Sequence, residues 1–332
     1  MTGSTETEWV DRLVSLGRTV RDTVIRASAR GSDLATPVAQ EGGDTIFAVD
    51  RHVEPVIENA ITSWGVPLTL IAEGMGEDGV KHFGLDSRYR LIMDPIDGTR
   101  NIMYDKRSAW FLAAVAEDRG PQTTVADAFV SVLMELPTSK AGYADVVSAS
   151  ADCVVCARES LHDHSTHAVP IQPSRAATLR NGFAQVASFF PGTKVYAAEL
   201  MERIVRETLG DIEPGVAAVF DDQYITTGGQ FVELLMGRDR FCCDLRPLFY
   251  EIIGGKTGNK IRGLECHPYD VAGLLAAEAS GVIITDGLGR PLRPPMDVHS
   301  PVHWCGYANE QLRLQIAPII TGYFSEHGVT PS

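Results

Sequence analysis

The chain has 332 residues, of which 44% are apolar and 22% charged, and its formal net charge is −14 at pH 7. This composition is typical of a globular protein with a substantial core, and so acidic a surface repels nucleic acids and anionic lipids, so we expect neither as a partner. No apolar run is long enough to predict a membrane span, and the first 30 residues lack the apolar region of a signal peptide, so we expect a soluble cytoplasmic protein.

The first half of the chain alternates between helix and strand patterns. Apolar side chains recur at helical spacing in residues 7–30 and 50–64. Short apolar runs predict strands at residues 68–72, 90–93, 110–116, 128–136 and 141–148. We expect the second of these strands to stop at Asp94-Pro95, because proline cannot donate to a sheet ladder. Residues 74–84 are predicted to form a loop.

The second half begins with a stretch, residues 150–180, that is rich in His, Ser and Ala and is predicted to be an irregular insertion. Helices are then predicted at residues 194–209, 226–237, 270–279 and 312–324, with strands at 241–245 and 282–284. Such alternation indicates a layered α/β or α+β architecture. We divide the chain into an N-terminal α+β subdomain (1–140), an insertion and connecting region (141–200) and a C-terminal α/β subdomain (201–332).

The most informative segment is Asp94-Pro95-Ile96-Asp97-Gly98-Thr99, which follows a predicted strand. Two carboxylates three residues apart can point into one small space, and Gly98 lets the backbone approach a ligand closely. The amides of Gly98 and Thr99 can open a helix that faces an anion. Magnesium takes oxygen ligands and shares its coordination shell with substrate phosphate, so the segment suits a magnesium and phosphate site. A plain turn with an Asx cap is the alternative interpretation.

Other acidic residues lie at the ends of predicted elements, and together they form a recognisable pattern. Glu73 and Asp50 precede Asp94 by 21 and 44 residues, and Asp270 lies in Tyr269-Asp270-Val271-Ala272-Gly273. With the Asp94–Thr99 segment, this pattern resembles the inositol monophosphatase family, within the lithium-sensitive phosphatase superfamily that includes fructose-1,6-bisphosphatases. The resemblance covers roughly residues 40–140 and 225–310. Each acidic residue alone is also compatible with a helix cap or a solvated charge.

The resemblance implies a layered α-β-α-β-α sandwich of α+β class, usually a homodimer, that hydrolyses a small phosphorylated metabolite with two or three Mg²⁺ ions per active site. It implies that Glu73, Asp94, the Ile96 carbonyl, Asp97 and Asp270 are metal ligands. Asp50, Thr99 and Glu73 are then the catalytic residues, with Thr99 and Asp50 orienting and deprotonating the attacking water. The Gly98 and Thr99 amides would bind phosphate, and the reaction would be a metal-assisted displacement at phosphorus.

The substrate is left open by departures from the family pattern. The position where inositol enzymes carry a ring-binding glutamate, seven residues before Asp270, is Gly263, and Glu265 is out of register. Arg100 and Arg107 follow the signature closely and are candidates for binding a second phosphate or carboxylate, whereas Lys106 fits a surface charge better. Fructose-1,6-bisphosphatase and nucleotide 3′-phosphatase activity are therefore alternatives to inositol monophosphatase activity.

Three other interpretations carry less support. Cys153 and Cys156 with His162, His164 and His167 could form a zinc site, although no second CxxC follows. Gly74 to Gly79 fits the dinucleotide-binding glycine pattern, but no periodic helix follows it. A non-catalytic regulatory or binding protein could retain the same fold. Against this last alternative, all five acidic positions and Thr99 are present.

Overall fold

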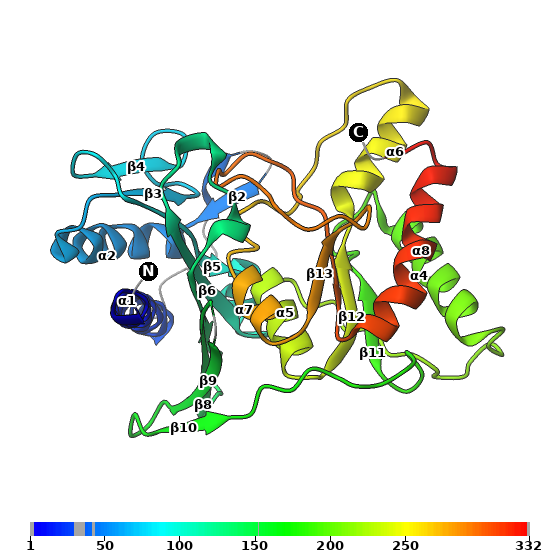
Figure 1. Ribbon diagram of the computed structural model, residues 1–332, viewed down its shortest axis with the longest axis horizontal. Helices are drawn as coiled ribbons and strands as arrows, with labels where there is room; N and C mark the ends of the chain where they lie inside the picture. Colours follow the sequence, from blue (N-terminus) through cyan, green and yellow to red (C-terminus); the bar gives the residue numbers. More distant parts are fainter. Residues whose placement is uncertain (1–2, 30–36, 42–43, 152, 331–332) are drawn as a thin grey trace.

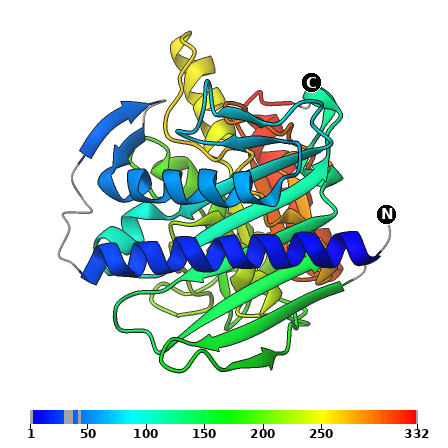
Figure 2. The ribbon, with the colours of Figure 1, turned by 90° about the vertical axis from the view of Figure 1, so that its left-hand side faces the viewer.

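The computed structural model describes residues 3–29, 37–41, 44–151 and 153–330, and it describes side chains for residues 5–27, 52–151 and 153–330. In this structure, the N-terminal helices cover one face of a large sheet. Helices α1 (Gly3–Ala29) and α2 (Ala48–Trp64) run side by side across this face (Figure 2). Most of the expected apolar stripe of α1 is buried against the sheet, namely Trp9, Leu13, Leu16, Val20 and Val24, whereas the sixth expected member, Ile25, is exposed.

The large sheet has eight strands in the order β10-β9-β8-β7-β6-β5-β3-β4. All neighbouring strands are antiparallel except β3 and β5, which are parallel. The strands are β3 (Leu68–Ala72), β4 (Val80–Phe83), β5 (Tyr89–Asp97), β6 (Ala109–Glu117), β7 (Val130–Leu136), β8 (Tyr143–Ser150), β9 (Cys153–Ser160) and β10 (Thr166–Val169). The sheet therefore extends well beyond residue 140.

Both faces of this sheet are covered, and strand β6 shows why its sequence is apolar throughout. Phe111, Ala113 and Val115 pack towards α1 and α2. Trp110, Leu112 and Ala114 alternate with them and pack on the opposite face. Helices α5 (Thr227–Leu235) and α7 (Leu274–Ala279) cover that opposite face and form the middle layer (Figure 1).

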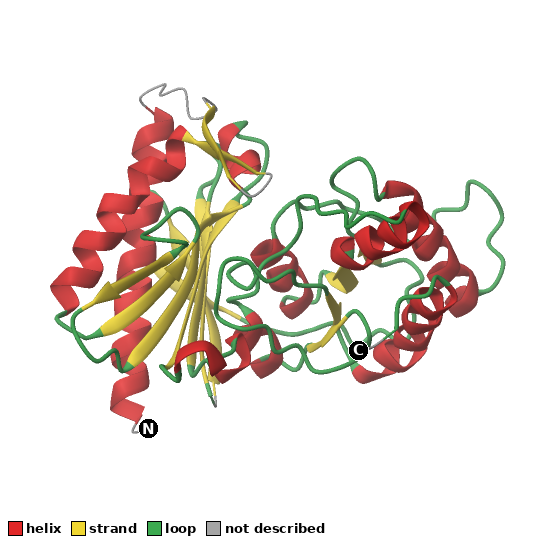
Figure 3. Ribbon diagram, turned by 90° about the horizontal axis from the view of Figure 1, so that it is seen from above, coloured by secondary structure: helices red, strands yellow, loops and turns green. Residues whose placement is uncertain are grey.

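A second sheet and an outer helical layer complete the architecture. Four strands in the order β11-β12-β14-β13 form the second sheet: β11 (Phe183–Val186), β12 (Asp239–Asp244), β13 (Ile283–Asp286) and β14 (Trp304–Tyr307). Helices α4 (Lys194–Leu209), α6 (Arg246–Thr257) and α8 (Glu310–Glu326) cover its outer side (Figure 3). The expected α+β sandwich of α-β-α-β-α layers is confirmed. A short hairpin, β1 (Pro37–Glu41) and β2 (Asp44–Phe47), precedes α2, and α3 (Thr99–Met103) follows β5.

Several local predictions were wrong. The segment expected to be an irregular insertion contains β9 and β10, which extend the large sheet, and the loop predicted at 74–84 contains β4. Strand β5 continues through Pro95 to Asp97, because an irregularity in its pairing with β6 lies between Asp94 and Asp97, where no amide donor is needed from the proline. Helix α7 begins four residues after Asp270. Helix α6 and strands β1, β11 and β14 were not predicted.

None of the described helices combines the length and the apolar character that crossing a membrane requires.

Candidate metal centre

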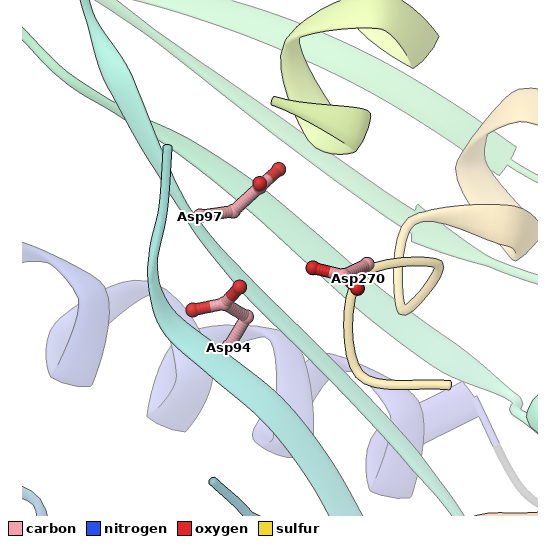
Figure 4. Close-up of side chains that lie close together, drawn as sticks. All are labelled: Asp94, Asp97 and Asp270. Atoms are coloured by element: carbon pink, nitrogen blue, oxygen red, sulfur yellow. The ribbon is translucent and has the colours of Figure 1, made fainter. Parts of the chain in front are cut away.

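The carboxyl end of strand β5 presents two aspartates on one side of the chain. Asp94 pairs with Leu112 of β6, the register then shifts, and Asp97 pairs with Trp110. The Asp94 Oδ1 atom accepts a hydrogen bond from the Ile96 amide at 2.9 Å, so the side chain caps its own turn. Figure 4 shows the carboxylates of Asp94 and Asp97 turned towards the same space.

The turn after Asp97 depends on glycine. Gly98 has φ = 89°, in the left-handed region, and an added Cβ would lie 2.8 Å from the Ile225 carbonyl oxygen. Helix α3 begins directly afterwards, at Thr99. The Thr99 hydroxyl donates a hydrogen bond to the Ile96 carbonyl at 2.9 Å, which fixes the side chain beside the carboxylates.

The carboxylate of Asp97 is held by the start of helix α5. Its Oδ2 atom accepts hydrogen bonds from the Thr226 hydroxyl at 2.5 Å and from the Gly228 amide at 2.6 Å. Thr226 is also the N-cap of α5, accepting from the Gly229 amide at 3.1 Å. An anionic side chain at a helix N-terminus is favourable because the terminal amides are otherwise unpaired. Asp97 thus links the large sheet to the middle helical layer.

Asp270 reaches the same point from a different part of the chain. It lies in the turn before α7, where its Oδ2 atom accepts from the His267 amide at 2.6 Å. Ligand oxygens of Asp94, Asp97 and Asp270 all lie within 4.8 Å of one another, and no other group of three potential metal ligands occurs among the described residues. The three side chains converge in Figure 4.

Electrostatics at this cluster are unfavourable without a cation. Burial, and then the charges of Asp97, Asp270 and Glu73, raise the pKa of Asp94 well above its usual value. Burial and the charge of Asp97 raise the pKa of Asp270 in the same way. Burial raises the pKa of Asp97 to about 6, although its hydrogen bonds to α5 oppose the shift. Mutual repulsion of buried carboxylates is relieved by a bound divalent cation, which suits an all-oxygen donor set.

The cluster opens into a cavity of about 350 Å³, a size that is ordinary for small-molecule sites. The predicted site residues that line it are Glu73, Asp94, Ile96, Asp97, Gly98, Thr99, Arg100 and Asp270. Glu54, in α2 and one helical turn after Asp50, also lines it. The side chain of Asp50 lies outside the described part of the structure.

One predicted substrate contact is not brought to the cavity. Arg107 does not line it; its guanidinium pairs with Asp222 at 2.6 Å and lies 3.7 Å from the ring centroid of Tyr224.

The cavity lining also includes side chains that the sequence analysis did not select, namely Phe189, Phe190, Arg246, Arg262, His267, Tyr269 and His299. His267 and Tyr269 lie within three residues of Asp270, so proximity to the C-terminal signature was an available signal for them. Phe189, Phe190 and Arg246 carried no such signal.

The structure speaks against two of the other interpretations. In the hairpin of β9 and β10, Cys153 is exposed and Cys156 buried, and no cluster of potential zinc ligands occurs there among the described residues. The glycine pattern at 74–79 leads into β4, which pairs antiparallel with β3, whereas a dinucleotide site requires a helix at this point.

Several solved structures have a fold similar to that of this chain. Fructose-1,6-bisphosphatase from Leishmania major matches with a TM-score of 0.69 and 12% identity over 95% of this chain and 92% of that chain. The chain has the inositol monophosphatase and fructose-1,6-bisphosphatase fold.

Two further structures with this fold are similar over nearly the whole chain. The extragenic suppressor protein suhB from Bartonella henselae matches with a TM-score of 0.61 and 16% identity, over 93% of this chain and 97% of that chain. A hypothetical protein from Pyrococcus horikoshii with similarities to inositol-1 monophosphatase matches with a TM-score of 0.62 and 14% identity, over 94% of this chain and 98% of that chain. No family model and no curated protein matches the sequence.

Proposed function

We propose that this protein is a Mg²⁺-dependent phosphatase of the inositol monophosphatase family that hydrolyses a small phosphomonoester. The observation that carries this proposal is the convergence of Asp94, Asp97 and Asp270 within 4.8 Å, beside the turn at Gly98 and Thr99. Asp97 and Asp270 are 173 residues apart in the sequence. Both signature segments of the family resemblance therefore contribute to one cluster, in a chain whose fold is also found in phosphatases.

The donor set fits magnesium. Asp94, Asp97 and Asp270 offer carboxylate oxygens, and Glu73 and Ile96, which line the same cavity, would add a carboxylate and a carbonyl oxygen. When bound, divalent cations in such a site polarise the phosphoryl group and lower the pKa of water. Two or three cations per site follow from the family resemblance.

The remaining steps belong to side chains and amides of the chain. Because the Thr99 hydroxyl donates a hydrogen bond to the Ile96 carbonyl, its oxygen can accept a hydrogen bond from the attacking water. We assign the pair of Thr99 and Asp50 to orienting and deprotonating that water, with the Asp50 carboxylate as the group that receives the proton, and we count Glu73 among the catalytic residues. The amides of Gly98 and Thr99 are assigned to the phosphate oxygens, where they stabilise the charge that develops in the transition state.

The experiment is a phosphate-release assay with purified protein. Inositol-1-phosphate, fructose-1,6-bisphosphate, adenosine 3′,5′-bisphosphate and histidinol phosphate are each tested with Mg²⁺ and with EDTA. We expect metal-dependent release from at least one, inhibited by millimolar Li⁺. Asp97→Asn should remove most of this activity while circular dichroism stays unchanged. Release that is absent from every compound would favour the non-catalytic binding protein.

Assembly and location are part of the same proposal. We propose a homodimer, as the family resemblance implies, that acts in the cytoplasm, as we expect from the sequence. Light scattering coupled to size-exclusion chromatography tests the assembly: a mass near twice the 36.0 kDa chain supports it, and a monomer contradicts it.

A further inference from the structure

Tyr269 lies beside the carboxylate cluster but has no role in the chemistry proposed above. It precedes Asp270 in the turn before α7, its side chain is 6% exposed, and it lines the cavity together with Glu73. The hydroxyl of a buried tyrosine normally has a hydrogen-bond partner, because an unpaired buried polar group is costly. The partners of this hydroxyl therefore indicate what the residue does.

The turn fixes the direction of the Tyr269 side chain. The Asp270 amide donates to the His267 carbonyl at 3.1 Å, and the Ala272 amide donates to the Tyr269 carbonyl at 3.2 Å. The ring of Tyr269 stacks on the ring of His267, with the centroids 5.4 Å apart and the planes at 15°. The Tyr269 hydroxyl and the His267 Nδ1 atom are 3.2 Å apart. Backbone and ring contacts together hold the hydroxyl in one place.

The hydroxyl of Tyr269 also donates a hydrogen bond to the Glu73 carboxylate. A carboxylate only accepts hydrogen bonds, and a tyrosine hydroxyl has a single proton, so at the other contact the His267 Nδ1–H group donates to the hydroxyl oxygen. The two bonds thus run in one direction, from His267 through Tyr269 to Glu73. Burial, and then the charges of Asp270, Glu73 and Asp94, raise the pKa of Tyr269 well above its usual value, which keeps the proton on the donor.

Glu73 needs such support more than the three aspartates of the cluster do. Each aspartate is short and accepts a hydrogen bond from a backbone amide, whereas Glu73 is longer, exposed, and outside the group whose ligand oxygens lie within 4.8 Å. Its charge raises the pKa of both Asp94 and Asp270, so electrostatic repulsion opposes its approach to them. A long side chain also loses conformational entropy when a cation fixes it. A hydrogen bond from a rigid donor counteracts both effects.

We propose that Tyr269 is a positioning residue, which holds the Glu73 carboxylate beside the aspartate cluster in the orientation that a divalent cation requires. This inference rests on the proposed function, because Glu73 is assigned there as a metal ligand. Groups that orient the ligands of a metal typically contribute about 10- to 100-fold to its affinity. Loss of the Tyr269 hydroxyl should therefore weaken the binding of Mg²⁺.

Isothermal titration calorimetry measures the affinity for Mg²⁺ in the absence of substrate. Tyr269→Phe removes one oxygen atom and keeps the ring that stacks on His267, and it leaves no buried charge unpaired because Glu73 is exposed. We expect the Kd for Mg²⁺ to rise at least about tenfold. In phosphate-release assays, the Mg²⁺ concentration that gives half the maximal rate should rise by the same factor. At saturating Mg²⁺, kcat should stay close to the parent value, because the bound cation then orders Glu73.

The matched control is Tyr323→Phe. Tyr323 is also buried and its hydroxyl also donates to a glutamate, Glu199, at 3.1 Å, but it lies between α8 and α4 and does not line the cavity. This variant should bind Mg²⁺ as the parent does. Glu73→Ala provides a second comparison: because Tyr269 acts through Glu73, adding Tyr269→Phe to Glu73→Ala should change the Kd no further. Thermal melts in EDTA show that each variant folds.

The possible failures are distinguishable. The positioning role would be overturned, with phosphatase function left intact, by a parent-like Kd for Tyr269→Phe or by an equal rise in Kd with and without the Glu73 side chain. A rise of similar size for Tyr323→Phe would overturn it as well. If the parent protein neither bound Mg²⁺ nor released phosphate from any compound, the proposed function would be wrong, and the inference with it.

Discussion

Asp94 is the side chain whose replacement best separates electrostatic repulsion from metal binding. Its ionisation is opposed by burial and by the charges of Asp97, Asp270 and Glu73 together. At an effective dielectric constant near 20, two full charges 4.8 Å apart repel by about 3 kcal/mol. Asp94→Asn removes one of these charges, and the amide oxygen can still accept the hydrogen bond from Ile96. In EDTA at pH 8, we therefore expect the variant to be at least as stable as the parent protein.

With Mg²⁺ present, we expect the parent protein to be more stable than Asp94→Asn. A ligand present at 100 times its Kd stabilises the folded state by about 2.7 kcal/mol. The unfolding entropy of a 332-residue chain is roughly 0.7 kcal/mol per kelvin, from about 2.1 cal/mol/K per residue, so the expected increase in Tm is about 4 °C. The parent protein should show this increase, and Asp94→Asn should show almost none because it lacks a charged ligand.

Differential scanning fluorimetry across a Mg²⁺ titration measures both effects. The matched control is Asp163→Asn, an exposed aspartate that caps a turn through the Ser165 amide and is absent from the cluster. Its response to Mg²⁺ should equal that of the parent. An equal increase in Tm for Asp94→Asn and for the parent would refute the assignment of this cluster as the metal site.

Three further predictions concern the support of the site and the response to pH. Thr226→Val removes the hydrogen bond to Asp97 and the N-cap of α5, so urea denaturation should show a loss of about 1–2 kcal/mol, and kcat should fall; an unchanged stability would contradict the capping role. Gly228→Ala places a Cβ against Leu112 and should cost about 1–3 kcal/mol in the same assay, whereas Gly255→Ala, with open space around it, should cost nothing; equal effects would contradict the packing argument. Burial raises the pKa of Asp239 to about 7, so the folded state holds a proton that the unfolded state releases, and stability should decrease as pH rises from about 4 to 7, by up to about 4 kcal/mol. Asp239→Asn should flatten that part of the profile of unfolding free energy against pH, and a profile identical to the parent's would contradict the assignment.

Strands and helices with a clear apolar period were predictable from the sequence. The α1 stripe and the buried runs of β3 and β6 are local patterns, and the structure confirms each of them. The acidic cluster was accessible only through the family resemblance, because no local rule says that Asp270 turns towards Asp97. Its companion assignments for Asp50, Glu73 and Thr99 remain proposals.

Other features depend on contacts that the sequence does not reveal. Strands β9 and β10 are rich in polar and small residues, and their pairing within a sheet edge decides their conformation. Strand β5 passes through Pro95 because its pairing with β6 is irregular there. That irregularity depends on the neighbouring strand, so the composition of β5 alone does not reveal it. The cavity is lined by Arg100, Phe190 and Arg246, which come from distant segments of the chain. Their spacing in the sequence follows no helix or strand period, so no sequence pattern predicts that they meet.

The start of helix α5 donates two hydrogen bonds to the Asp97 carboxylate, so the position of the middle helical layer determines the orientation of a residue in the cluster. Thr226 and Gly228 set the rotation of that carboxylate, so a small slide of α5 along its axis would turn it. Substitutions in the packing of α5, well away from any ligand, would then weaken cation affinity before they reduced the amount of folded protein. Screens that score only solubility or expression would overlook such variants.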